Sequence, residues 1–122
     1  MEIGVERVVE KFQRYAGEAP DGEDVARERL CQALCDECAA AVAELLRPGL
    51  EEIPAAAEAL AAAEAFYQLA LLDQAAGPEV VSSPELKMEL GRRAEYAAML
   101  REEKRRACRG FLREEGFYFG QA

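Results

Sequence analysis

The stretch PAAAEALAAAEAFYQLALLDQAA, Pro54 to Ala76, contains the strongest helical signal in the chain. Nearly half of it is alanine, the best intrinsic helix former. Only three of its residues are charged, namely Glu58, Glu64 and Asp73. Large apolar residues lie on more than one side of this helix, which is typical of a helix buried among others. We therefore predict the central helix of a small all-α bundle, with Leu60, Tyr67 and Leu71 mostly buried on one side of it.

The chain before the central stretch predicts two further helices. Residues 3–16 have the period of a short amphipathic helix. Residues 17–22 are typical of a turn, because they hold two glycines and a proline. Acidic residues at Asp21, Glu23 and Asp24 suit the N-terminus of a second helix. That helix is predicted to run to Arg47, where a Pro-Gly pair stops it.

The chain after the central stretch predicts a fourth principal helix. Gly77 and Pro78 are expected to end the central helix, and residues 79–83 to form a short extended link. Ser82 or Ser83 can cap the last helix, with a proline at its first position. The helical pattern then continues to about Glu115, which is longer than a compact bundle of this size requires. We expect a single domain, residues 1–122, of about four helices.

The composition argues against several classes of function. A net charge of −9 argues against nucleic acid as a partner of the whole surface. The chain has no histidine, the commonest general base and metal ligand. No Ser-His-Asp set and no phosphate-binding glycine loop is present. We therefore expect a protein that is not an enzyme and uses no cofactor.

The expected location is cytoplasmic. The central stretch is long enough to cross a bilayer, but charges lie within it, so we expect a buried helix and no membrane contact. No secretion signal is visible. Four cysteines without such a signal suggest a reducing compartment and free thiols.

The cysteines of CQALCDEC, Cys31, Cys35 and Cys38, have the spacing that radical-SAM enzymes use for an iron–sulfur cluster. Cys108 is a candidate fourth ligand for zinc. The same spacing also places the three cysteines on one helix face, which continues in Val42 and Leu45. Because buried cysteine behaves as a small hydrophobe, we favour core packing, with no metal, over the metal-site alternative.

Two features of the last segment suggest a binding surface. The first consists of Arg101, Arg105, Arg109 and Arg113, four residues apart. Like charges at this spacing repel each other, so nearby anions would stabilise them. The four arginines form either a basic face exposed to solvent or a surface that binds acidic groups. The acidic first two-thirds of another copy would supply such groups in a head-to-tail contact, and nucleic-acid phosphates are the second alternative.

The second feature is the run of aromatic residues Phe117, Tyr118 and Phe119. Three adjacent aromatic side chains cannot all point into one small core. They either fold over the end of the bundle or lie in a protein interface, where aromatics are enriched.

The order of these elements carries a resemblance. An acidic entry, Asp21 to Asp24, leads into an Ala-rich helix, Leu30 to Leu46. A second Ala-rich helix with aromatics, Ala63 to Leu72, and a Val-containing link follow, and the chain closes on GFYFG, Gly116 to Gly120. This layout resembles the head–tail connector (adaptor) family of tailed phages and prophages.

The resemblance implies a non-enzymatic, ring-forming subunit that docks to portal or tail proteins. It would be made in the bacterial cytoplasm and end in the virion. The alternative is a small helical binding or regulatory module that docks a partner through its last helix and aromatic tail.

Overall fold

The computed structural model describes residues 2–18, 24–80 and 84–113. These residues form α1 (Val5–Ala16), α2 (Val25–Leu45), α3 (Ala55–Val80), α4 (Pro84–Cys108) and the short 3₁₀ helix η1 (Arg109–Phe111). The predicted all-α bundle is therefore confirmed.

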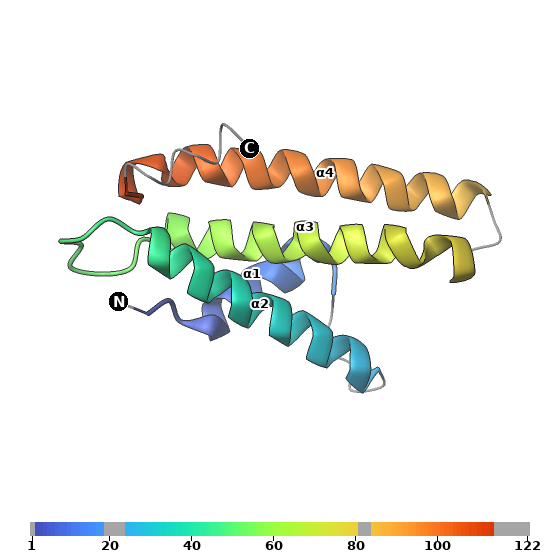
Figure 1. Cartoon of the computed structure of the whole chain (residues 1–122), viewed down its shortest axis with the longest axis horizontal. Helices are drawn as coiled ribbons and strands as arrows, with labels where there is room; N and C mark the ends of the chain where they lie inside the picture. Colours follow the sequence, from blue (N-terminus) through green and yellow to red (C-terminus); the bar gives the residue numbers. More distant parts are fainter. Residues whose placement is uncertain (1, 19–23, 81–83, 114–122) are drawn as a thin grey trace.

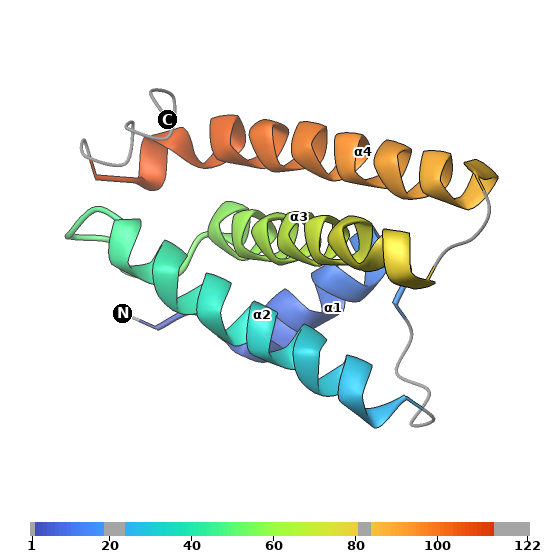
Figure 2. The ribbon, with the colours of Figure 1, turned by 45° about the vertical axis from the view of Figure 1, so that its right-hand side comes forward.

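α3 is the centre of the arrangement (Figure 1). α4 runs back along one side of α3 as an antiparallel neighbour, and α1 and α2 pack on the other side. The turned view shows the same layers, with α1 and α2 crossing below α3 (Figure 2). The end of the α3–α4 hairpin extends beyond the part that α1 and α2 cover.

The core lies around the first four turns of α3. Its alanines at positions 57, 61, 62, 63 and 65 are fully buried, as is Leu60. Alanine side chains are short, so neighbouring helices can approach the backbone of α3 closely and fill the core with their own larger residues. Residues 55–76 are long and apolar enough to cross a membrane by length and composition, and 61% of their most apolar window is buried inside the fold.

Local sequence signals set several helix ends as predicted. α1 ends at Ala16, and the next residue, Gly17, caps it with a φ of 71° and donates its N–H to the carbonyl of Gln13. Asp24 caps α2, because its carboxylate accepts a hydrogen bond of 3.0 Å from the backbone N–H of Arg27. α4 begins at Pro84, as predicted.

The end of α2 differs from the prediction. α2 ends at Leu45, two residues early, and Leu46 forms an isolated antiparallel bridge with Leu112. The N–H of Arg47 donates to Phe111 O at 2.9 Å, and the N–H of Arg113 donates to Leu45 O at 2.8 Å. These groups bond across the two chain segments, so neither helix continues through them.

The ends of α3 and α4 also differ. α3 runs through Gly77 and Pro78 to Val80. Proline lacks the N–H that would bond to the carbonyl of Gln74, but Gln74 is exposed, so water can satisfy that carbonyl. α4 ends at Cys108 rather than near Glu115, since the chain turns through η1 to pair with the end of α2. The serine caps at positions 82 and 83 lie outside the described residues.

The predicted burial of the central helix holds only in part. Leu60 is fully buried and Tyr67 is half-buried, but Leu71 is 41% exposed, so its predicted burial was wrong. α2 diverges from α3 toward its own N-terminus (Figures 1 and 2), so it lies close to only part of the length of α3.

The contrast between Leu60 and Leu71 is testable. Leu60→Ala should lower the free energy of unfolding by about 2–5 kcal/mol, because it leaves a cavity in the core. Leu71→Ala should cost less than about 1 kcal/mol, since its side chain is largely solvated. Chemical denaturation followed by circular dichroism measures both, and equal losses would contradict this packing of α3.

Candidate functional site

Two of the four arginines in the predicted stripe face α3. Arg101 Nε donates to Glu64 Oε2 at 2.8 Å, and Arg105 Nε donates to Glu64 Oε1 at 3.1 Å. The guanidinium of Arg101 also lies 4.6 Å from the centre of the Tyr67 ring. The anion that these arginines require is therefore supplied by the central helix of the same chain.

The other two arginines of the stripe lie beyond α4. Arg109 is an exposed residue of η1. Arg113 donates from Nε to the carbonyl of Leu46 at 3.1 Å and so holds the chain against the end of α2. The i+4 spacing does not produce one continuous basic face, because the helix ends at Cys108. Two of the four cations that were expected to bind acidic groups of another copy in a head-to-tail contact thus bind Glu64 of the same chain.

The aromatic residues Phe117, Tyr118 and Phe119 lie outside the described residues. Their predicted role in binding stays a prediction.

The cysteines pack into the core. Cys35, Cys38 and Cys108 are buried, Cys31 is half-buried, and all four are free thiols. Burial raises the pKa of Cys35 and Cys38 to about 12, and that of Cys31 and Cys108 to about 11. Within residues 2–18, 24–80 and 84–113, no group of three or more Cys, Asp or Glu side chains is placed to hold a metal. The fourfold cysteine site considered from the sequence is therefore not assembled by the described residues.

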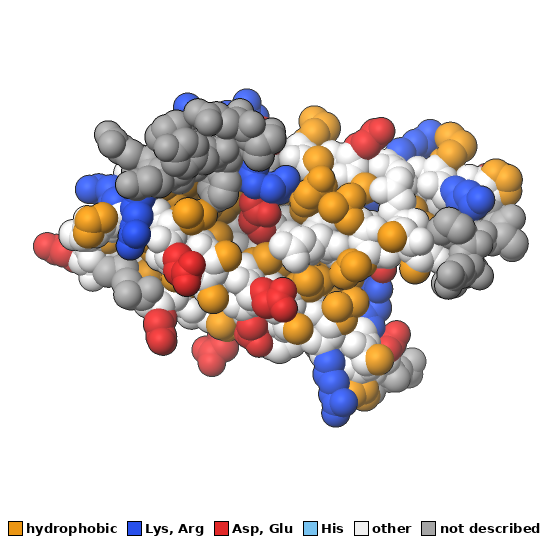
Figure 3. Space-filling view, viewed as in Figure 1, with side chains coloured by type: hydrophobic (Ala, Val, Ile, Leu, Met, Phe, Trp, Pro, Cys, Tyr) orange, Lys and Arg blue, Asp and Glu red, His pale blue; other side chains and the backbone are white. Residues whose placement is uncertain are grey.

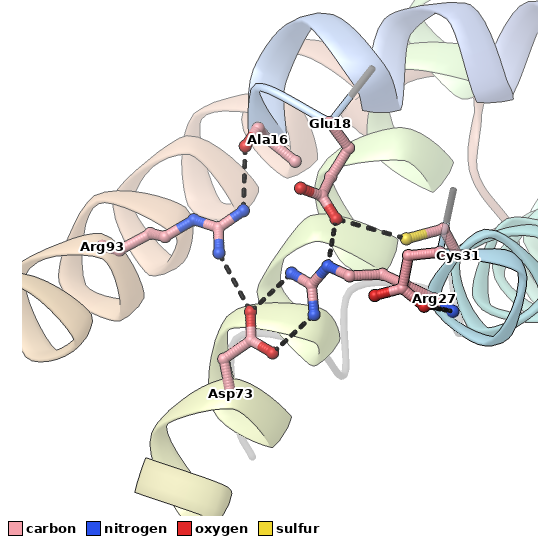
Figure 4. A network of polar contacts seen from close by, with 7 residues as sticks. Ala16, Glu18, Arg27, Cys31, Asp73 and Arg93 are labelled. Atoms are coloured by element: carbon pink, nitrogen blue, oxygen red, sulfur yellow. Dashed lines mark hydrogen bonds and ion pairs between the residues drawn. The ribbon is translucent and has the colours of Figure 1, made fainter. Parts of the chain in front are cut away.

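A polar junction that the sequence did not reveal joins all four helices (Figure 4). Asp73 of α3 accepts two hydrogen bonds of 2.9 Å from Arg27 of α2 and one of 3.0 Å from Arg93 of α4. Arg93 also donates to the carbonyl of Ala16 at 2.8 Å, and Arg27 donates to Glu18. The guanidinium of Arg27, followed by that of Arg93, lowers the pKa of Asp73. The partners of Asp73 lie 46 and 20 residues away in the sequence, so no local motif marks the junction.

A cleft of about 450 Å³ lies beside this junction, between α1 and the first half of α2. Its lining includes Phe12, Gly17, Arg27 and Cys31. Arg27 is already bonded to two carboxylates, and no buried side-chain nitrogen or oxygen of the described residues lacks a partner. Among the described residues, the cleft therefore presents no buried side-chain nitrogen or oxygen without a partner to a ligand.

The candidate functional surface belongs to the layer formed by α3 and α4, the α3–α4 layer. Of the eight large hydrophobic residues that are exposed in the described part of the chain, six lie here. They are Leu71 and Leu72 on α3 and Leu86, Met88, Tyr96 and Met99 on α4. Along the upper edge of the molecule, where α4 lies, hydrophobic, acidic and basic side chains all reach the surface (Figure 3). A surface of this mixed kind suits contact with another protein.

No protein-family model, curated protein or solved structure matches this chain.

The Asp73 junction gives a pH-dependent prediction. The pKa of Asp73 is lowered in the folded state, so its stabilising effect is present above the unfolded-state pKa and is lost as pH falls through the folded-state pKa. Asp73→Asn should lower the free energy of unfolding by about 1–3 kcal/mol at neutral pH and by less in acid. Denaturation across pH measures this, with the exposed loop variant Glu51→Gln as control. A cost for Asp73→Asn that does not vary with pH would contradict it.

The thiols give a second prediction. Because their pKa values are raised, few thiolates exist at pH 8, and a disulfide reagent should react slowly with the native protein and with four thiols after unfolding. Elemental analysis should find no stoichiometric metal. One zinc or iron per chain, lost in Cys35→Ser, would falsify the assignment of these cysteines to core packing.

Proposed function

We propose that this chain is a non-enzymatic protein that works by binding another protein chain through its α3–α4 layer. The observation that carries the proposal is the concentration of exposed large apolar side chains on that layer. Burial of their exposed surface against a partner would be favourable, because apolar surface is stabilised when it leaves water. Their charged neighbours on α4 would form the polar rim that surrounds such contacts.

The order of the helices supports a biological setting as part of this proposal. A subunit of a phage or prophage head–tail connector would use such a layer to dock to portal or tail proteins in the bacterial cytoplasm. The layout of the Ala-rich helices supports this setting. Flanking genes that encode portal, capsid and tail proteins would agree with it, and flanking genes of another process would reject it.

A residue-specific photo-crosslinker tests the binding surface. Placed at Met99, which is 72% exposed on α4, it should yield covalent adducts with protein in cells that make this chain. Placed at Arg29, an exposed residue of α2, it should yield few adducts. Mass spectrometry of the adducts then identifies the bound chain.

Both labelled proteins should keep the helical content of the wild type, because both positions are solvated. Equal labelling at Met99 and Arg29, or no adduct at Met99, would reject the α3–α4 layer as a binding surface.

A further inference from the structure

The outer face of α4 carries a second row of residues, which lie mostly in solvent. Positions four and three residues apart in alternation place these side chains in one row, and every one of them is exposed. We call them the outer row: Glu89, Arg92, Tyr96, Met99, Glu103 and Arg106. We propose that the outer row binds the outer row of a second copy of this chain, with the two α4 helices antiparallel. This inference rests on the proposed function and names its partner.

The charges on the two faces of α4 differ in their pairing. On the inner face, Arg93 binds Asp73, and Arg101 binds Glu64. In the outer row, none of the four charged residues forms an ion pair within the described part of the chain. The inner charges thus serve the fold, and the outer charges are available to a partner.

The outer row is complementary to itself in one orientation. If two copies meet antiparallel around a twofold axis midway between Tyr96 and Met99, Tyr96 lies opposite Met99 of the second copy. Arg92 then lies opposite Glu103, and Glu89 opposite Arg106. Each contact occurs twice, as a twofold axis requires. A parallel pair in the same register would instead place each charged residue beside the same residue of the second copy, so that like charges meet, which is unfavourable.

The chemistry of the centre suits such a contact. Tyr96 is 54% exposed although its ring packs against Phe66, with 6.0 Å between the ring centres. That packing fixes the ring while leaving part of it open. A thioether beside an aromatic ring, as Met99 would be beside Tyr96 of the second copy, is a favourable contact. The centre of the row is therefore apolar, and each of its two ends carries one acidic and one basic residue.

The described part of the chain leaves the outer side of α4 open to a second helix. α4 is the outermost helix, with α3 on one side and no other described helix on its outer side (Figure 1). A single pair of helices buries less surface than the ~1,200 Å² typical of stable complexes. We therefore expect a weak, reversible dimer whose ion pairs are exposed, so that salt weakens it.

Charge reversal tests the pairing. The antiparallel dimer contains two contacts between positions 92 and 103. Arg92→Glu places two carboxylates opposite each other at both of them, and Glu103→Arg places two guanidinium groups opposite each other at both. Each variant alone should therefore dimerise about tenfold more weakly or worse. Mixing the two variants allows a heterodimer in which the two reversed positions face each other, so that a carboxylate again lies opposite a guanidinium.

The heterodimer contains one contact between the two reversed positions and one between the two unchanged positions. Both of these contacts join a carboxylate to a guanidinium. The mixture should consequently form a heterodimer as readily as the wild type forms its dimer.

Matched controls carry the same charge changes away from α4. They are Arg29→Glu on α2 and Glu51→Arg in the loop before α3, both at exposed positions. Both should dimerise like the wild type in sedimentation velocity over a range of concentration at low salt. Circular dichroism should show the same helical content for all five proteins.

Three outcomes would overturn the inference. They are a wild type that stays monomeric at high concentration and low salt, single variants that dimerise like their controls, and a mixture that dimerises no better than its components. Adducts between Met99 and a different protein, together with a monomeric wild type, would reject the outer-row dimer and leave the proposed function standing. A failure of both experiments would reject both.

Discussion

Three carboxylates of α3, those of Glu58, Glu64 and Asp73, are the constraint on which the arrangement of the other helices depends. A carboxylate in a largely buried position is costly unless a cation reaches it. Each of the three meets cations from neighbouring helices. Glu58 meets Arg7 and Lys11 of α1, Glu64 meets Arg101 and Arg105 of α4, and Asp73 meets Arg27 of α2 and Arg93 of α4. The three acids therefore specify which helix lies on which side of α3.

Alanine explains why these ion pairs can form. Small side chains on α3 let the neighbouring helices pack near its backbone, so their long arginine side chains reach across to the acids. The volume of the core is then filled by residues of the outer helices, among them Phe12 of α1 and Cys35 of α2. The cysteines belong to this packing, which is why burial dominates their pKa values.

α4 links the fold to the proposed function, because its two faces have different chemistry. Arg93, Arg101 and Arg105 face α3 and fix α4 to the rest of the bundle. The opposite face keeps Tyr96 and Met99 in solvent between charges of both signs. Because these ion pairs hold α4 against α3, the helix loses little conformational freedom when a partner binds to its opposite face.

The sequence by itself determined the helical elements and the central position of α3, since these follow from local propensity, period and the scarcity of charge between residues 54 and 76. The cap at Asp24 and the helix start at Pro84 were equally local. Only the tertiary structure decided which anion the arginines meet, because spacing places Arg101 and Arg105 on one face without saying what that face contacts. It also decided the exposure of Leu71, because the period of a helix does not show how far its neighbours extend along it.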